Sequence, residues 1–187
     1  SLTAASHLLT RPELPDEQLE KIGATIFSEV QRLNDLATDF LDLSRLESGR
    51  VRFTREPVHL EGLIHECVEI VKPGAFENDI TIQTAFPESI NPVQGDRNRL
   101  KQVLLNLLTN AIKYNHPGGS ITVRLESSGD YVQLAVQDTG IGIPDESMEH
   151  IFTRFYRSPE SAGTVPGTGL GLVIARRIIE SHMGTIE

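Results

Sequence analysis

Two asparagines, a lysine and a tyrosine recur at helical spacing near the middle of the sequence. They are Asn106, Asn110, Lys113 and Tyr114. Their positions i, i+4, i+7 and i+8 place all of them on one face of a helix. A carboxamide oxygen is a hard, neutral ligand of the kind that Mg²⁺ accepts together with water and phosphate oxygens. The lysine could meet phosphate oxygens, and the tyrosine could lie against a flat base. The alternative is a pair of buried amides that hydrogen-bond to a neighbouring strand.

Two glycine-containing segments could contact other parts of a nucleotide. Asp138 begins Asp-Thr-Gly-Ile-Gly-Ile-Pro directly after a predicted strand. Its carboxylate could accept a hydrogen bond from the exocyclic amine of a purine, although an ordinary Asp-x-Gly turn is the alternative. The second segment, Gly-Thr-Gly-Leu-Gly-Leu from Gly167, opens a predicted helix, whose N-terminus offers N–H groups and a positive dipole end to phosphate. Its spacing is neither the dinucleotide fingerprint nor a P-loop, which excludes those two nucleotide-binding folds.

Residues 152–157 lie between these segments and combine three aromatic rings with two arginines. The following residues, 158–166, are small and polar and contain Gly and Pro, as is typical of a mobile loop. We interpret the two stretches as the hinge and the body of a lid over a ligand. The alternative is a surface loop anchored by packing of the phenylalanines.

A long helix is predicted before these segments. Residues 16–49 carry apolar side chains three or four positions apart, and we expect this helix to begin at an Asp16 cap and to end at Gly49. A helix of this length spans about 45 Å. Its apolar stripe needs a partner, most simply a second copy of the chain. The alternative is an internal helix of a monomeric bundle.

The chain divides into two predicted domains. Residues 2–10 resemble the end of another helix and residues 11–15 a turn, so residues 1–50 are expected to form a helical hairpin with a short first arm. Residues 51–56 are a predicted linker, and residues 57–187 a second domain that mixes helices and strands.

The second domain has a recognisable order of elements. We expect extended segments at 51–53 and 57–60, helices at 60–71, 96–114 and about 169–182, and strands at 80–86, 120–126 and 131–137. The last two strands form a predicted hairpin, and Asp96 caps the helix that carries the asparagines. Because that strand pair is antiparallel, the pattern favours an α+β sandwich over a doubly wound sheet.

Composition excludes several classes of protein. The 187 residues carry a formal charge of −9 with a pI near 5.1, which argues against wholesale nucleic-acid binding. Hydrophobic residues make up 39%, enough for a core, but no apolar run approaches the roughly 20 residues of a membrane span. The single cysteine, Cys67, rules out a disulfide framework and favours a cytosolic setting.

Taken in order, the segments resemble the N, G1, F and G2 boxes of bacterial sensor histidine kinases. The matching stretches are Asn-x₃-Asn-Ala-x-Lys-Tyr, Asp-x-Gly-x-Gly, Phe-x-Arg-Phe-Tyr-Arg and Gly-Thr-Gly-Leu-Gly-Leu, and residues 43–49 resemble the end of that family's second dimerisation helix. The resemblance implies a two-layer α/β sandwich of the Bergerat (GHKL) type, preceded by a helical hairpin that dimerises into a four-helix bundle. It also implies binding of ATP and Mg²⁺, transfer of the γ-phosphoryl group to a histidine, and relay to an aspartate of a response regulator.

The same resemblance assigns roles to individual residues. Asn110 is the implied Mg²⁺ ligand, and Asn106 and Lys113 are implied catalytic residues beside it. Tyr114 would line the base pocket, and Asp138 would accept a hydrogen bond from the adenine amino group. The other residues implied for the nucleotide pocket and lid are Gly140, Gly142, Ile143, Arg154, Arg157, Gly167, Thr168, Gly169, Leu170 and Gly171.

The family's phosphorylated histidine lies in a box resembling Ser-His-Glu-Leu-Arg-Thr-Pro. His7 has a similar setting, but Leu8 follows it where an acidic neighbour would act as base for the ring proton. We therefore expect the acceptor to lie upstream of Ser1. We also expect the family's last strands to lie beyond Glu187.

Two other functions remain open. GHKL-type ATPases such as gyrase carry Glu at the position of Asn106 to activate water, and an amide cannot act as a base, so this residue favours transfer over hydrolysis. A non-catalytic dimerisation scaffold is disfavoured because the boxes are intact. The expected partners are ATP, a response-regulator receiver domain and a second copy bound through the N-terminal helices, with no nucleic acid and no direct membrane contact. The expected location is the cytoplasm, either as a free protein or as the cytoplasmic portion of a membrane-anchored sensor.

Overall fold

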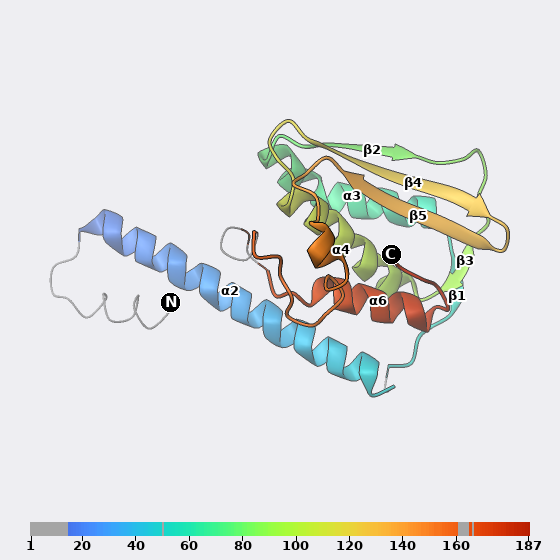
Figure 1. Cartoon of the computed structure of the whole chain (residues 1–187), viewed down its shortest axis with the longest axis horizontal. Helices are drawn as coiled ribbons and strands as arrows, with labels where there is room; N and C mark the ends of the chain where they lie inside the picture. The colour runs from blue at the N-terminus through green and yellow to red at the C-terminus, as the bar shows by residue number, and fades with distance from the viewer. Residues whose placement is uncertain (1–14, 50, 161–164, 166) are drawn as a thin grey trace.

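The computed structural model describes residues 15–49, 51–160, 165 and 167–187. In it a long helix, α2 (Asp16–Glu47), leads into a unit of mixed helices and strands, called the mixed unit below (Figure 1). The predicted first arm of the hairpin, most of the predicted turn and His7 lie outside the described residues. Within the described part of the chain, no helix combines the length and the apolar character that crossing a membrane requires.

The mixed unit runs from the first strand to the last helix. Its strands are β1 (Glu56–Val58), β2 (Thr81–Ala85), β3 (Val93–Gly95), β4 (Ser120–Ser128) and β5 (Tyr131–Asp138), and its helices are α3 (Leu60–Glu77), α4 (Arg97–Lys113), α5 (Asp145–Met148) and α6 (Gly171–Ser181). Strands β2, β4 and β5 form one sheet in that order, and α3 and α4 cover one of its faces (Figure 1). The predicted α+β two-layer class is confirmed.

The sheet combines a local strand pair with a distant one. β4 and β5 form the predicted antiparallel hairpin, and the loop at Gly129 and Asp130 has Gly129 at φ 61°, a conformation that favours glycine. β2 pairs parallel with β4, so that Thr81 lies opposite Ser120. β1 pairs antiparallel with β3 in a separate two-stranded sheet. These last two pairings were not predicted.

Two helix boundaries differ from the prediction. α3 continues through Pro73 to Glu77 instead of ending near residue 71. Val71 and Ala75 are buried on either side of Pro73, and this packing offsets the backbone hydrogen bond that a proline cannot donate. The expected Asp16 cap is wrong, because Pro15 occupies the cap position with an extended ψ of 144° and α2 begins at Asp16 itself.

Helix α4 is held by apolar contacts on two sides. Between α3, α4 and the sheet, the most deeply buried side chains are Leu63, Ile64, Cys67, Leu108, Ile121 and Val123. A second cluster joins Val103 of α4 to Leu43 of α2 and to Leu170, Ile174 and Ile178 at α6. Full burial of one such side chain contributes about 1.5–3 kcal/mol. This packing fixes α4 and leaves its asparagine-bearing face available for a site.

Candidate functional site

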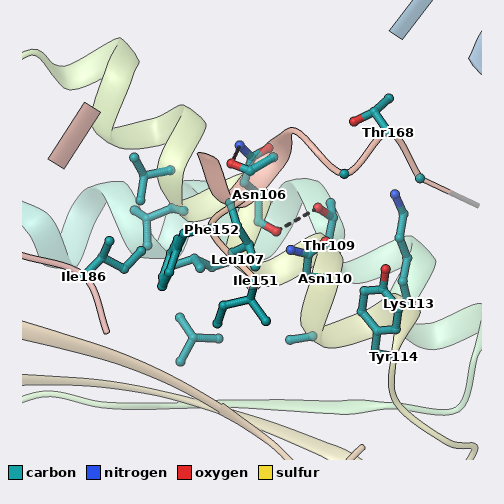
Figure 2. Close-up of a pocket in the computed structure, with 18 of the residues that line it drawn as sticks. Asn106, Leu107, Thr109, Asn110, Lys113, Tyr114, Ile151, Phe152, Thr168 and Ile186 are labelled. Atoms are coloured by element: carbon teal, nitrogen blue, oxygen red, sulfur yellow. Dashed lines mark hydrogen bonds between the residues drawn. The ribbon is translucent and has the colours of Figure 1, made fainter. Parts of the chain in front are cut away.

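A cavity of about 1640 Å³ is lined by residues of α4, β5, α2 and the segment before α6. Figure 2 shows its α4 side together with Phe152 and Thr168. Most of the residues singled out from the sequence line it, although they come from four separate segments. They are Asn106, Asn110, Lys113, Tyr114, Asp138, Gly142, Ile143, Arg157, Gly167, Thr168, Gly169 and Gly171. Gly140, Arg154 and Leu170 are not among its lining residues.

The α4 face of the cavity carries the two asparagines. The Asp96 carboxylate caps α4 by accepting hydrogen bonds from the backbone N–H groups of Asn98 and Arg99, as predicted. The Asn106 side-chain nitrogen donates to the carbonyl oxygen of Gly171 at 3.0 Å, so this amide bonds to the start of α6 and not to a neighbouring strand. Asn110 lies one turn further along, on the same side of the helix (Figure 2).

Sequence reasoning missed Thr109, which lines the cavity between the two asparagines. Its hydroxyl donates to the carbonyl oxygen of Leu105 at 2.7 Å, inside the helix. A threonine at helical spacing carries no chemical signal in the sequence, so only the structure places it in the site.

The segment after β5 is clamped against the end of α4. Asp138 accepts a hydrogen bond from the backbone N–H of Gly140 at 2.8 Å, and Ile141 N–H donates to the carbonyl oxygen of Tyr114 at 3.0 Å. A Cβ at Gly140 would overlap that same carbonyl, which explains the glycine. From the sequence, Asp138 was interpreted either as part of an ordinary Asp-x-Gly turn or as a carboxylate that contacts a ligand. In the structure Asp138 forms the turn and also lines the cavity.

The two ends of the predicted lid are tied together. Phe155 N–H donates to the carbonyl oxygen of Gly169 at 3.0 Å, and a Cβ at Gly169 would come within 2.8 Å of the Phe155 carbonyl carbon. The Arg157 guanidinium donates to the carbonyl oxygen of Val165. Tyr156 donates its hydroxyl hydrogen to the buried Ser147 hydroxyl at 2.9 Å. The described ends of the lid segment are therefore anchored to the rest of the fold.

Helix α2 also contributes to the cavity, which was not foreseen. The Thr168 hydroxyl donates to the Asp39 carboxylate at 2.8 Å, across 129 positions of sequence. Burial raises the pKa of Asp39, the Thr168 hydrogen bond and Lys113 oppose that effect, and the charges of Asp35 and Asp42 add to it. Asp35, Asp39 and Asp42 recur at helical spacing in the sequence. This spacing was the signal from which a contribution of α2 to the site could have been predicted.

Arg154 lies on the α2 side of the fold. Its guanidinium forms an ion pair with the Glu47 carboxylate near the end of α2. Leu170, one of the other residues absent from the cavity lining, is fully buried in the cluster under α6. Its side chain therefore supports the glycine segment from behind.

The donor set for a metal ion is sparse within the protein. Among the described residues no group of three or more His, Cys, Asp or Glu side chains is placed to hold one. The amide oxygen of Asn110 could supply one ligand, and phosphate oxygens and water would supply the others. This division suits Mg²⁺, which usually keeps several waters and is shared between protein and substrate phosphates.

Comparison with known proteins identifies relatives of this arrangement. Residues 95–187 match the family described as histidine kinase-, DNA gyrase B- and HSP90-like ATPase. The signal transduction histidine-protein kinase/phosphatase MprB of Mycobacterium tuberculosis is 35% identical over 188 residues, which cover 100% of this chain and 36% of that protein. The chain spans 21% of the length of the non-motile and phage-resistance protein of Caulobacter vibrioides, to which it is 35% identical, and 36% of the length of MprB.

Solved structures show the same similarity. The mycobacterial sensor histidine kinase MprB has 33% identity and a TM-score of 0.59, with 70% of this chain and 81% of that chain covered. The histidine kinase ThkA in complex with the response regulator protein TrrA has 27% identity and a TM-score of 0.78, with 98% of this chain and 50% of that chain covered.

Proposed function

Because this chain belongs to the histidine kinase family, we propose that it is the ATP-binding and dimerisation part of a sensor histidine kinase. In this role it binds Mg·ATP, transfers the γ-phosphoryl group to a histidine, and supports relay to a response-regulator aspartate in the cytoplasm. The observation that carries the proposal is the cavity in which one face of α4 meets the Asp138 turn and the glycine segment before α6.

Each end of the cavity suits a different part of ATP. The Asp138 carboxylate, beside Tyr114, would accept a hydrogen bond from the adenine amino group, and the Tyr114 ring would lie along the base. Gly142 has φ 72°, which lets the backbone turn close to the ligand. Ile143, which also lines the cavity, would add apolar surface beside the base.

The phosphate end would lie between α4 and α6. The Asn110 amide oxygen would share a Mg²⁺ ion with phosphate oxygens, and the ion would neutralise charge that develops during transfer. Lys113, Thr168 and the backbone N–H groups from Gly167 to Gly171 would contact the phosphates from the protein side. Of the two lid arginines, Arg157, at the anchored end of the lid, is the one that lines the cavity.

Asn106 favours transfer over hydrolysis. An amide has no basic atom that could take a proton from water, and its nitrogen here already donates to Gly171. A protein of this fold that hydrolyses ATP needs a carboxylate at the position of Asn106 to take the proton from the attacking water. The role supported for Asn106 is therefore to hold α6 and its glycine segment against α4.

The dimer belongs to the same proposal. The amino-terminal half of α2 extends away from the mixed unit (Figure 1). Val30 near the end of that half and Leu33 just after it are 52% and 50% exposed, and neither lines the cavity. A second copy of α2 would cover these apolar side chains. We further propose a response-regulator receiver domain as the phosphoryl acceptor protein. The complex of the similar kinase ThkA with TrrA supports this choice.

The site is tested by nucleotide binding and by phosphoryl transfer. Mg·ATP at 100 times its Kd should stabilise the protein by about 2.7 kcal/mol, seen as a raised melting temperature. Asn110→Ala should remove the Mg²⁺ dependence of this shift, whereas Asp138→Asn should weaken ATP binding at least tenfold and GTP binding less. With labelled ATP, the protein should transfer acid-labile label to a histidine of a longer homologous chain. A melting temperature unaffected by millimolar Mg·ATP would rule out the proposed function.

A further inference from the structure

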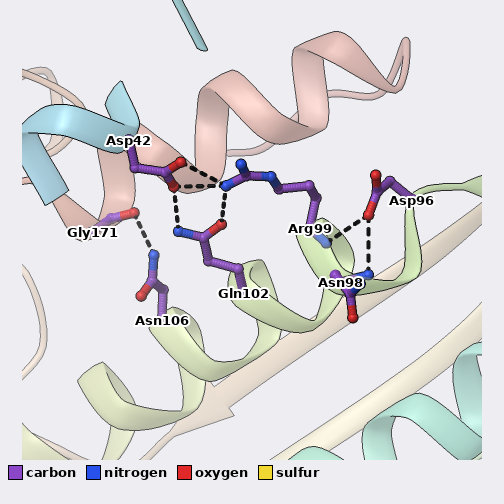
Figure 3. A network of polar contacts seen from close by, with 7 residues as sticks. All are labelled: Asp42, Asp96, Asn98, Arg99, Gln102, Asn106 and Gly171. Carbon is purple, nitrogen blue, oxygen red and sulfur yellow. Dashed lines mark hydrogen bonds and ion pairs between the residues drawn. The ribbon is translucent and has the colours of Figure 1, made fainter. Parts of the chain in front are cut away.

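Helix α4 is tied to its surroundings by polar contacts at both ends. Near its amino-terminal end, Arg99 pairs with Asp42 of α2 (Figure 3). At its carboxyl-terminal end Tyr114 is the cap residue, and the side chain of the next residue, Asn115, bonds to the start of β4 and to the residue after β5. We call the residues of this second set of contacts, Asn115, Ser120 and Thr139, the strand-end cluster.

Thr139 closes the β4–β5 ladder with its side chain. Because Ile121 lies opposite Asp138, the next pair in the register is Ser120 with Thr139. In a regular antiparallel ladder such a pair exchanges two backbone hydrogen bonds. Here Thr139 N–H donates to the Ser120 carbonyl oxygen at 3.1 Å, but Ser120 N–H donates to the Thr139 hydroxyl oxygen at 2.9 Å. The hydroxyl therefore replaces a backbone carbonyl where the chain leaves β5 for the Gly140 turn.

Asn115 joins this end of the ladder to α4. Its side-chain nitrogen donates to the Ser120 carbonyl oxygen at 3.2 Å. The hydrogen of the Thr139 hydroxyl is shared between Asn115 Oδ1 at 3.3 Å and the Ser120 carbonyl oxygen at 3.4 Å. A Cβ at Gly119 would overlap Asn115 Oδ1 and the His116 carbonyl oxygen, so glycine leaves room for the asparagine side chain. The ends of α4 and β5 are thereby held in one arrangement.

These two ends carry the groups that would contact the base. Tyr114 caps α4, Asp138 is the last residue of β5, and both line the cavity, whereas Asn115 and Thr139 are not among its lining residues. Asp138 Oδ1 accepts the Gly140 N–H, and Oδ2 is the oxygen that would receive the adenine amino group. Because a hydrogen bond weakens steeply as it departs from linearity, the strength of that bond depends on how firmly the strand end is held.

We propose that Thr139, supported by Asn115, is a positioning residue for base recognition. Its hydroxyl holds the Asp138 carboxylate where it selects a purine with an amino group at position 6 over one with a carbonyl group there. A carbonyl oxygen at that place would face the carboxylate as acceptor against acceptor. The inference rests on the proposed function, because it requires the cavity to bind the base of ATP beside Asp138.

The test compares Mg·ATP with Mg·ITP, the inosine nucleotide, which carries a carbonyl in place of the 6-amino group. Isothermal titration calorimetry of the full chain gives both Kd values, and wild type should bind Mg·ATP about tenfold more tightly, the worth of one hydrogen bond to a charged group. Thr139→Val removes the hydroxyl and should lower this preference about threefold. Thr139→Ser keeps the hydroxyl and should retain the preference, and Asn115→Ala should lower it.

Two controls separate positioning from a general loosening of the fold. Thr122→Val makes the same chemical change in β4, where the Thr122 hydroxyl makes no hydrogen bond within the described part of the chain, and it should leave the preference unchanged. In an Asp138→Ala background there is no carboxylate to position, so Thr139→Val should change the preference no further. Urea unfolding of each variant gives the stability, which a merely structural Thr139 would alter without altering the preference.

The possible outcomes separate the inference from the proposed function. If wild type prefers Mg·ATP but folded Thr139→Val keeps that preference, or lowers it equally in the Asp138→Ala background, the inference is wrong and the proposed function stands. If Thr139→Val does not fold, an unchanged preference in Asn115→Ala overturns the inference. If wild type binds Mg·ATP and Mg·ITP equally, Asp138 does not read the amino group, and the inference fails while ATP binding stands. If wild type binds neither nucleotide, the proposed function fails, and the inference with it.

Discussion

The side-chain nitrogen of Asn106 donates a hydrogen bond to the carbonyl oxygen of Gly171 at 3.0 Å and so joins α4 to the first residue of α6. This contact sets the distance between the asparagine face and the glycine segment. Because Gly171 offers only its carbonyl oxygen here, the atom of residue 106 that faces it has to be a donor.

Replacing Asn106 by an acceptor-only side chain should therefore weaken the fold. Asn106→Asp places a carboxylate against the Gly171 carbonyl, and we expect a loss of about 1–3 kcal/mol in the free energy of unfolding at pH 7. Asn106→Ala should cost less, because it removes the donor without adding a repelling charge. Urea unfolding of the two variants checks this order, and an aspartate variant as stable as the alanine variant would contradict it.

Gly140 should tolerate no side chain. Gly140→Ala places a methyl group on the Tyr114 carbonyl oxygen, so the turn after β5 must move, at an expected cost of about 1–3 kcal/mol. The matched control is Gly62→Ala on the exposed side of α3, where a Cβ meets nothing within 4 Å. That change should stabilise the protein by up to about 1 kcal/mol. Thermal unfolding should show shifts of opposite sign, and shifts of the same sign would refute the close contact.

Because Asp96 caps α4, the free energy of unfolding should depend on pH in the acid range. Partial burial disfavours the charged form of Asp96, but backbone N–H groups of Thr54, Arg99 and Asn98 and the Arg99 charge outweigh it and lower its pKa. A lowered folded-state pKa means that the ionised carboxylate stabilises the fold above the usual value of 3.8 and loses this effect as the pH falls through the lower, folded-state value.

The variant that measures this effect is Asp96→Ala. At pH 7 it should be less stable than wild type by about 1 kcal/mol, the usual worth of a helix cap. The difference should shrink steadily as the pH is lowered below 3.8. Urea unfolding across this range gives the comparison, and a difference that grows toward acid pH would show that the carboxylate is not the stabilising form.

The exposed stripe of α2 should hold two copies together. Leu33→Glu introduces a charge where a facing apolar side chain is expected, so sedimentation should show dissociation to monomers at micromolar concentration. Ala24→Glu adds the same charge at an exposed position on a different face of α2 and should leave the dimer intact. Equal behaviour of the two variants would place the interface elsewhere.

Local signals in the sequence were sufficient for several elements. The helix that became α4 carries its own cap at Asp96, and the β4–β5 hairpin is closed by its own turn at Gly129. Both depend on contacts between residues close in the chain. The pairing of β1 with β3 and of β2 with β4 depends on segments that meet only when the core forms, and short strands carry little pattern of their own.

Pro73 shows why local rules can fail. A proline indicates the end of a helix, and the predicted helix stopped before it. α3 continues because Val71 and Ala75 are both buried in the core, and the free energy of that burial is a tertiary term that no local rule contains.

The sequence by itself determined the chemistry available to the site: the amides and lysine on one helix face, the Asp138 turn, and the glycines before α6. These depend on residue type and on spacing within single elements. Only the tertiary structure decided that α2 closes one side of the cavity, that Asp39 receives the Thr168 hydroxyl, and that Arg154 turns to Glu47. The physical reason is that these contacts depend on how Leu43 packs α2 against α6, which is set by shape and burial across more than a hundred residues of chain.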